Sequence, residues 1–197
     1  MNDVKVIREA IPLDFANYLA LQTDLWMQFT AGENTDPNIL VSNAVGWYSP
    51  IFLESLLVHL QPLIEKHSGK ELWPTYSYAR IYCNGGGMKR HTDRNAGEYA
   101  VSLCLAKDGN YPLYFERTSG KVKAYELDPG DLVLYHGIEW PHWRPKYKGR
   151  RHIQAFLCYV DKHGPYRERK MDGRKGLMQQ APSDNFLYAT LPNEIKN

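Results

Sequence analysis

The residues of this chain that are best suited to chemistry are two histidines and one aspartate. His91 and Asp93 stand two positions apart, and His142 follows 49 positions after Asp93. Two imidazoles and one carboxylate can cap one face of an octahedral metal ion and leave three positions open. This ligand set is typical of Fe(II) sites that also bind a cosubstrate and oxygen. The sequence therefore predicts a metal site at His91, Asp93 and His142.

A candidate carboxylate-binding residue follows the second histidine. Arg151 lies nine positions after His142 and is preceded by a second arginine, Arg150. A guanidinium group can bind a carboxylate through two parallel hydrogen bonds. The two arginines alternate on one predicted strand, so only one of them can point inward. We favour Arg151, because the residues on its face are small or apolar, as a pocket requires. These residues are Ile153, Ala155 and Leu157.

The predicted strands have to bring these side chains together. On an extended segment His91 and Asp93 point to the same face, whereas His142 needs a different strand. Turn residues separate several segments that are rich in aromatic and apolar residues. Those segments are 76–82, 99–105, 111–116, 122–127, 131–135 and 152–160. Since no helix-length segment interrupts them, the pattern favours an antiparallel sandwich or barrel over a parallel sheet.

Residues 76–166, just under half of the chain, resemble a known catalytic core. The resemblance is to the double-stranded β-helix, a jelly-roll or cupin-like fold, of the 2-oxoglutarate/Fe(II)-dependent oxygenases, and the prolyl-4-hydroxylase-like branch is the nearest. It rests on Arg80-Ile81-Tyr82, Gly85-Gly86-Gly87, His91-Thr92-Asp93, 127–135, His142 and Gly149-Arg150-Arg151. The runs His142-Trp143-Arg144-Pro145 and 156–161 also resemble bacterial and phage members without assigned substrates.

The resemblance implies both a reaction and the residues for it. Fe(II) would bind His91, Asp93 and His142, and Arg151 would bind the distal carboxylate of 2-oxoglutarate. Tyr82 lies nine positions before His91, where relatives place a tyrosine that helps to bind the same carboxylate. The enzyme would be a dioxygenase that hydroxylates a small molecule or a peptide or protein side chain. It would consume O2, release succinate and CO2, and be stimulated by ascorbate.

Two of these assignments have rivals within the sequence. His136 competes with His142 as the third ligand, and we prefer His142 because relatives place this ligand several residues beyond the strand that covers 130–135. Tyr82 has a structural interpretation as a core aromatic whose hydroxyl reaches the rim.

The expected substrate contacts flank the ligands: Arg94, Trp140, Trp143 and Arg144. A tryptophan next to a ligand can equally serve as packing. Prolyl hydroxylases commonly carry Gly-Gly before the strand that covers the site, whereas this chain has Gly109 alone, followed by Tyr111 and Pro112. One glycine fewer and a proline make the start of this strand stiffer than in prolyl hydroxylases. The resemblance therefore does not extend to their specificity for peptidyl proline.

The rest of the chain is predicted to support a mainly β core with flanking helices, in one domain. Residues 1–70 form the helical support, 71–166 the core and 167–197 a tail. Asp14 can cap a first helix, whose apolar positions are Phe15, Tyr18, Leu19, Leu25, Trp26 and Phe29. Ser49 and Pro50 can begin a second helix that Gly69 ends, with Pro62 as a candidate kink.

Two other segments are predicted to lie outside the barrel. The loop 31–44 is interpreted as a connector, with a lid over the site as the alternative. The tail has basic runs and packs through Phe186, Leu187 and Tyr188, unless it is partly disordered. It is the other candidate for closing over the site.

Charge and cysteine usage narrow the choice of partners. The formal net charge of +2 does not suit a nucleic-acid binder, and the basic run 144–151 is interpreted as a solvated loop. The DNA-repair branch of the same oxygenases carries a second arginine six residues after the one that binds the keto acid. Six residues after Arg151 this chain has Leu157. Three cysteines without a Cys-x-x-Cys pair predict free thiols and a cytoplasmic protein, and no segment is long enough to span a membrane.

Two other classes remain open at this point. One is a cupin-like metal enzyme that uses no keto acid, and the other is a non-catalytic binding module on the same fold. The intact ligand set counts against the binding module. Arg151 and Tyr82 count against the cupin-like enzyme, because an enzyme without a keto acid needs no carboxylate clamp.

Overall fold

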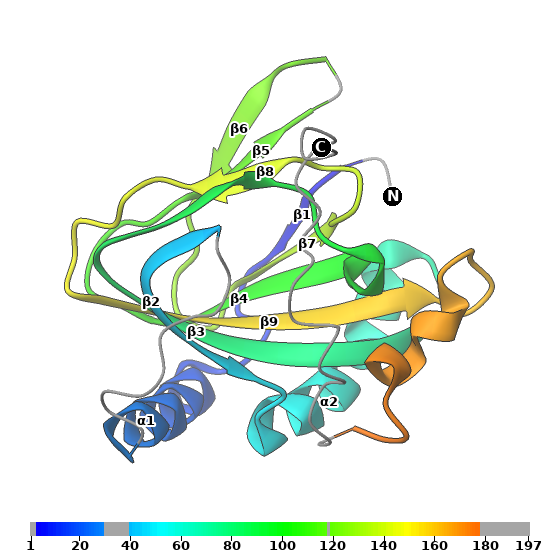
Figure 1. The fold of residues 1–197 in the computed structure, drawn as a ribbon, viewed down its shortest axis with the longest axis horizontal. Coiled ribbons are helices and arrows are strands. Elements are labelled where there is room, and N and C mark those ends of the chain that lie inside the picture. Colours follow the sequence, from blue (N-terminus) through cyan, green and yellow to red (C-terminus); the bar gives the residue numbers. More distant parts are fainter. Residues whose placement is uncertain (1–2, 30–39, 118, 178–197) are drawn as a thin grey trace, which may run out of the picture.

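The computed structural model describes residues 3–29, 40–117 and 119–177 (Figure 1). These residues form two α-helices, α1 (Leu13–Phe29) and α2 (Ile51–Ser68), and two 3-10 helices, η1 (Asn95–Gly97) and η2 (Arg167–Gly173). The strands are β1 (Lys5–Ile7), β2 (Val41–Tyr48), β3 (Leu72–His91), β4 (Tyr99–Lys107), β5 (Leu113–Glu116), β6 (Val122–Tyr125), β7 (Leu132–His136), β8 (His142–Arg144) and β9 (Arg151–Asp161).

The strands form one antiparallel sheet in the order β1-β7-β4-β9-β3-β8-β5-β6, with β2 paired to β3. In Figure 1 the sheet rolls up, so that β8, β5 and β6 lie across from β4, β9 and β3. Both α-helices lie on the outer face of the sheet, α2 against β3 and β9 and α1 against β4. The predicted antiparallel barrel with helices braced on its outer face is therefore confirmed.

The rolled sheet separates two apolar cores. One core lies between the helices and the sheet and contains Leu57 of α2 together with Ile153, Ala155 and Leu157 of β9. The other lies inside the barrel and contains aromatic and sulfur-bearing residues such as Tyr82, Tyr135 and Cys158. Because side chains alternate along a strand, one face of β9 serves each core. Cys104 and Cys158 are buried free thiols, as predicted, and Cys83 is a half-buried free thiol.

All six predicted strands are present, as β3 to β7 and β9, but three more were not predicted. β1 and β8 are each three residues long. β2 occupies the end of the predicted loop 31–44, so the loop prediction is wrong for residues 41–44. Residues 31–39, and the tail residues Phe186, Leu187 and Tyr188, lie outside the described part of the chain. The first seventy residues thus supply two strands as well as helices.

The helices begin and end close to the predicted residues. α2 follows Pro50 and ends at Gly69, which takes a left-handed conformation (φ 72°) while its N–H donates to the carbonyl of Glu65. Pro62 lies within α2 and does not end it. α1 rests on the sheet through small residues such as Ala16 and Ala20 as well as Leu19, so several of its predicted apolar contacts are exposed. No helix in the described part of the chain is long and apolar enough to cross a membrane.

Candidate metal centre

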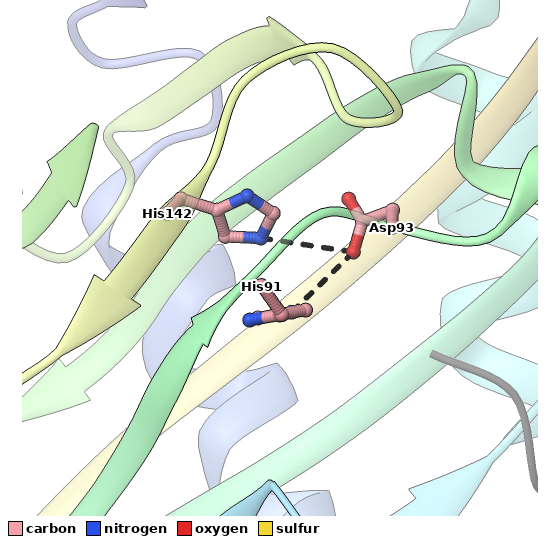
Figure 2. A group of neighbouring side chains, drawn as sticks. All are labelled: His91, Asp93 and His142. Carbon is pink, nitrogen blue, oxygen red and sulfur yellow. Dashed lines mark ion pairs between the residues drawn. The ribbon is translucent and has the colours of Figure 1, made fainter. Parts of the chain in front are cut away.

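The three predicted ligands meet at the junction of β3 and β8. His91 is the last residue of β3, and His142, the first residue of β8, lies directly opposite it. The Nε2 atoms of His91 and His142 lie 3.7 and 3.6 Å from the same carboxylate oxygen, Oδ1 of Asp93 (Figure 2). One ligand atom from each residue lies within 4.8 Å of the other two. Three donor atoms at this spacing can share one metal ion.

Backbone carbonyls hold both imidazoles in the orientation that a metal needs. Nδ1 of His91 lies 2.9 Å from the carbonyl oxygen of Lys89, and Nδ1 of His142 lies 2.9 Å from that of Trp140. A carbonyl oxygen only accepts hydrogen bonds, so each Nδ1 carries the proton and donates it. The lone pair of each ring is then on Nε2, the atom that faces Asp93.

The protonation states also suit a cation. Burial, and then the neighbouring His142, lower the pKa of His91 to about 4, and burial lowers the pKa of His142 to about 4. Both rings are therefore neutral and able to coordinate at neutral pH. Burial raises the pKa of Asp93. A bound divalent cation would offset this effect, because it favours the charged carboxylate.

A glycine at the end of β7 sets the position of the carboxylate. The N–H of Asp93 donates to the carbonyl of Gly137 over 2.9 Å. A Cβ on Gly137 would overlap Oδ2 of Asp93 and the carbonyl oxygen of Gly97. The nearby hydroxyl of Tyr135 favours the charged form of Asp93 and lowers its pKa, against the larger effect of burial. Sequence reasoning missed Gly137 and Tyr135, and their only signal was their place around the end of a predicted strand.

The rival histidine lies outside this group. The ring of His136 packs against Tyr99, with 5.0 Å between the centroids, and its Nε2 is 3.8 Å from Oε1 of Glu98. The structure therefore brings His142, and not His136, to His91 and Asp93.

Known proteins resemble this chain in structure but not in sequence. No family model and no curated protein matches it. A prolyl-4-hydroxylase from Pseudomonas putida matches with a TM-score of 0.66 at 16% identity, over 82% of this chain and 94% of that one. A prolyl hydroxylase from Trichoplax adhaerens, in complex with a peptide fragment of hypoxia inducible factor, matches with a TM-score of 0.64 at 17% identity, over 88% and 89% of the two chains.

A third match holds a metal and the keto acid. HygX from Streptomyces hygroscopicus, with nickel and 2-oxoglutarate bound, has a TM-score of 0.61 at 9% identity, over 81% of this chain and 83% of that one. The fold is that of the 2-oxoglutarate/Fe(II)-dependent oxygenases. Prolyl hydroxylases are among its structural neighbours, as the sequence resemblance predicted.

The orientation predicted for Arg151 within this oxygenase fold is wrong. Its side chain is 46% exposed and forms an ion pair with Asp24 of α1, outside the barrel. The apolar residues that share its face of β9, including Ile153 and Ala155, pack against the helices rather than lining a pocket. Both faces of β9 are buried, so apolar character did not reveal which face lines the interior. His152, on the alternate face, points inward instead.

Tyr82 is fully buried inside the barrel. Its hydroxyl accepts a hydrogen bond of 3.3 Å from Nη1 of Arg80 and lies 3.7 Å from the sulfur of Met88. A role in binding the keto acid stays a prediction.

The four predicted substrate contacts are found in different surroundings. Trp143 faces out of the barrel, because it alternates with the two inward residues of β8, and stacks on Tyr114 with 5.6 Å between the ring centroids. Its contact with the substrate stays a prediction. Trp140 is half-buried, and the guanidinium carbon of Arg117 lies 5.6 Å from the centroid of its ring.

The two predicted arginines are buried to different depths. Arg94 is held by both carboxylate oxygens of Asp172, at 2.5 and 2.6 Å, and lies 4.3 Å from the ring centroid of Tyr76. Arg144 is buried inside the barrel. Sequence reasoning missed the interior polar residues that accompany it, namely Arg80, Ser102, His152 and Gln154.

Proposed function

We propose that this protein is an Fe(II)- and 2-oxoglutarate-dependent dioxygenase that hydroxylates a small molecule or a peptide or protein side chain. The observation that carries the proposal is the arrangement of His91, Asp93 and His142. Two neutral imidazoles present their Nε2 atoms to one carboxylate oxygen. In this ligand set the open positions suit Fe(II) rather than a closed structural site.

The interior of the barrel fits an anionic cosubstrate as well as a metal. Nε of Arg144 carries a proton to donate, yet it is buried and lacks a hydrogen-bond partner within the described part of the chain. Buried donors are rarely left unsatisfied, so this atom indicates a ligand with acceptor oxygens, or ordered water, inside the barrel. Among proteins of this fold, HygX has 2-oxoglutarate bound and the Trichoplax enzyme has a peptide bound.

The residues of this chain would position the reactants and exclude water. Bound Fe(II) and 2-oxoglutarate supply the oxidation, in which O2 is consumed and succinate and CO2 are released. His91, Asp93 and His142 would hold the iron, and Tyr82 would donate its hydroxyl proton to the distal carboxylate of the keto acid. Aromatic rings shield His142, since the centroids of Tyr135 and Phe115 lie 4.9 and 5.6 Å from that of the imidazole.

The remaining parts of the proposal rest on the sequence. The chain is a single domain with residues 71–166 as its catalytic core, and it works in the cytoplasm, as its free thiols suggest. Ascorbate stimulates the enzyme. Arg94, Trp140 and Trp143 remain candidates for contact with the substrate.

The first test is the release of succinate from 2-oxoglutarate in the presence of Fe(II), oxygen and ascorbate. The comparison is between the wild type, His142→Ala and the matched control His136→Ala. We expect turnover in the wild type and in the control, and none in His142→Ala. If the wild type releases no succinate, we would measure the binding of 2-oxoglutarate to the Fe(II)-loaded protein without oxygen, to separate a missing substrate from a wrong function. Its absence would reject the oxygenase in favour of a cupin-like metal enzyme or a binding module.

A further inference from the structure

A buried arginine lies beside the candidate metal centre. Arg144 is two residues after the ligand His142, on the same inward face of β8, and its exposed fraction is 3%. Alternate residues of a strand are about 6.6 Å apart, so the two side chains enter the barrel side by side. The pairing of β8 with β3 places Arg144 opposite Met88, next to the pair formed by His142 and His91.

The charge of Arg144 has no carboxylate partner in the described part of the chain. Nη1 donates to the carbonyl oxygen of Tyr111, and Nη2 donates to Oε1 of Gln154 over 3.3 Å. Nε has no partner among the described residues, and the guanidinium carbon lies 4.8 Å from the ring centroid of Tyr111. A buried charge without a counter-charge is costly, so this site favours an anionic ligand.

Neighbouring side chains hold the guanidinium in place without neutralising it. Oε1 of Gln154 lies 2.7 Å from Nε2 of His152, and Nε2 of Gln154 donates to Oγ of Ser102 over 2.8 Å. Since Oε1 only accepts, Nε2 of His152 is the donor, and Nδ1 is left buried without a partner. Burial, and then the charge of Arg144, lower the pKa of His152 to about 3, so the imidazole is neutral. The positive charge of this cluster therefore comes from Arg144.

We propose that Arg144, rather than Arg151, binds the distal carboxylate of 2-oxoglutarate. This assignment rests on the proposed function. Arg144 and Tyr82 both pack on Tyr111: the guanidinium carbon of Arg144 and the ring centroid of Tyr82 lie 4.8 and 5.2 Å from the centroid of its ring. The two side chains therefore line the same part of the barrel interior. The keto acid would extend from the metal into the barrel along β8, and its carboxylate would supply the missing counter-charge. Arg151, on the outer face of β9, takes no part.

Arg80 is the competing cation, and the experiment has to include it. Its guanidinium carbon lies 5.1 Å from the ring centroids of both Tyr78 and Phe156, and Nη1 donates to the hydroxyl of Tyr82. Arg80 makes further contacts besides these, whereas Nε of Arg144 is buried without a partner among the described residues. We therefore assign the distal carboxylate to Arg144 rather than to Arg80.

The test is calorimetric titration of 2-oxoglutarate into the Fe(II)-loaded protein without oxygen, which needs no turnover. The variants are Arg144→Gln, Arg80→Gln and, as the matched control, Arg151→Gln. Losing a buried charged hydrogen bond should raise the Kd of Arg144→Gln by about 30-fold or more. Arg151→Gln should stay within about twofold of the wild type, as expected for an exposed ion pair. Wild-type affinity in Arg144→Gln, or a larger loss in Arg80→Gln or Arg151→Gln, overturns the assignment.

Pyruvate separates a lost anchor from a damaged barrel, because it chelates a metal in the same way but has no distal carboxylate. We expect Arg144→Gln and the wild type to bind pyruvate equally. If Arg144→Gln also binds pyruvate more weakly, the variant Arg144→Lys is measured next. Because this variant retains the positive charge, it should recover at least part of the affinity for 2-oxoglutarate. No recovery would reject the proposal. If the metal-loaded wild type binds no 2-oxoglutarate at all, the proposed function itself fails.

Discussion

At the scale of single residues, two backbone carbonyls convert a pair of histidines into candidate metal ligands. The carbonyls of Lys89 and Trp140 hold the Nδ1 protons of His91 and His142, and burial keeps both rings neutral. Each ring therefore reaches its binding state without a metal. An arrangement of this kind is preorganised, so little freedom is lost when an ion binds.

Replacing His142 should remove the metal, whereas replacing His136 should not. His142→Gln deletes one of three ligands, and we expect the affinity for Co(II), used as a spectroscopic substitute for Fe(II), to fall by more than about 100-fold, beyond the usual effect of an outer-shell change. His136→Gln, the matched control, should bind like the wild type. The visible spectrum of Co(II) during titration measures both. Equal loss in the two variants would contradict the assignment of the ligands.

Gly137 should be nearly as important as the ligands, although it contributes no side chain. A Cβ at this position overlaps Oδ2 of Asp93 and the backbone of Gly97, so Gly137→Ala must displace the carboxylate. We expect about a 10- to 100-fold loss of Co(II) affinity, as for other changes that misplace a ligand. Gly176→Ala is the control, because a Cβ there has no neighbour within 4 Å. An unchanged affinity in Gly137→Ala would show that the carboxylate can shift without penalty.

The metal ligands could be predicted from the sequence, but the arginine could not. The spacing predicts that His91 and Asp93 lie close together; in the structure β3 ends at His91, Asp93 follows it, and His142 is brought to both. The choice of Arg151 depended on which face of β9 lines the interior. That choice is decided by the helices packed on the other face, which strand periodicity does not report.

At the scale of elements, the segment after the last strand is tied to the metal-binding loop. In η2, Met171 and Asp172 have positive φ angles of 53° and 57°, which are unfavourable for residues other than glycine. The buried carboxylate of Asp172 accepts hydrogen bonds from both terminal nitrogens of Arg94 and, over 2.7 Å, from the hydroxyl of Tyr48. Arg94 directly follows the ligand Asp93. The ion pair therefore offsets local strain and fixes the loop that carries the ligand.

Removing the charge of Asp172 should destabilise the protein strongly. In Asp172→Asn the largely buried guanidinium of Arg94 loses its bidentate carboxylate, and we expect the free energy of unfolding to fall by about 3 kcal/mol. Glu168→Gln is the control, because this exposed residue of the same segment pairs only with Arg169, at 3.8 Å, among the described residues. Urea denaturation of both variants measures the effect. A difference below about 0.5 kcal/mol between the variants would mean that the segment is not held by this ion pair.

Elements with local signals were predictable, and elements that depend on distant partners were not. Pro50 marks the start of α2 and Gly69 marks its end, because each of these residues restricts or frees its own backbone conformation. β8 has three residues between two prolines, and β1 has three residues that pair with β7 about 127 positions away (from Val6 to Val133). Such short strands exist only because a neighbouring strand offers hydrogen bonds. Sequence periodicity cannot detect them.

At the scale of the whole molecule, one rolled sheet separates a structural core from a polar, aromatic interior. The helix-side core is apolar and holds the barrel together. The interior combines aromatic residues with buried titratable groups, of which His91, His142 and His152 are neutral. Buried neutral histidines favour metal binding, but they make the fold sensitive to acid. The same feature therefore links the candidate site to overall stability.

Acid should destabilise the metal-free protein well above the pH at which carboxylates are protonated. A histidine in the unfolded chain has a pKa of about 6.5, whereas burial lowers the pKa of His91 and His142 to about 4 and that of His152 to about 3. As the pH falls below 6.5, the unfolded state binds protons that the native state does not bind. Stability is therefore lost on acidification, by up to about 1.4 kcal/mol per pH unit for each histidine.

Between pH 7 and pH 5 this linkage amounts to about 2 kcal/mol for each of the three histidines. The raised pKa of Asp93 acts in the opposite direction, because protonation of its carboxyl in the native state adds stability as the pH falls. Urea denaturation in the presence of a chelator, at pH 7 and pH 5, measures the balance. His152→Gln should reduce the loss by about 2 kcal/mol, the contribution of one such histidine. An equal loss in the wild type and in His152→Gln would contradict the burial of His152 as a neutral imidazole.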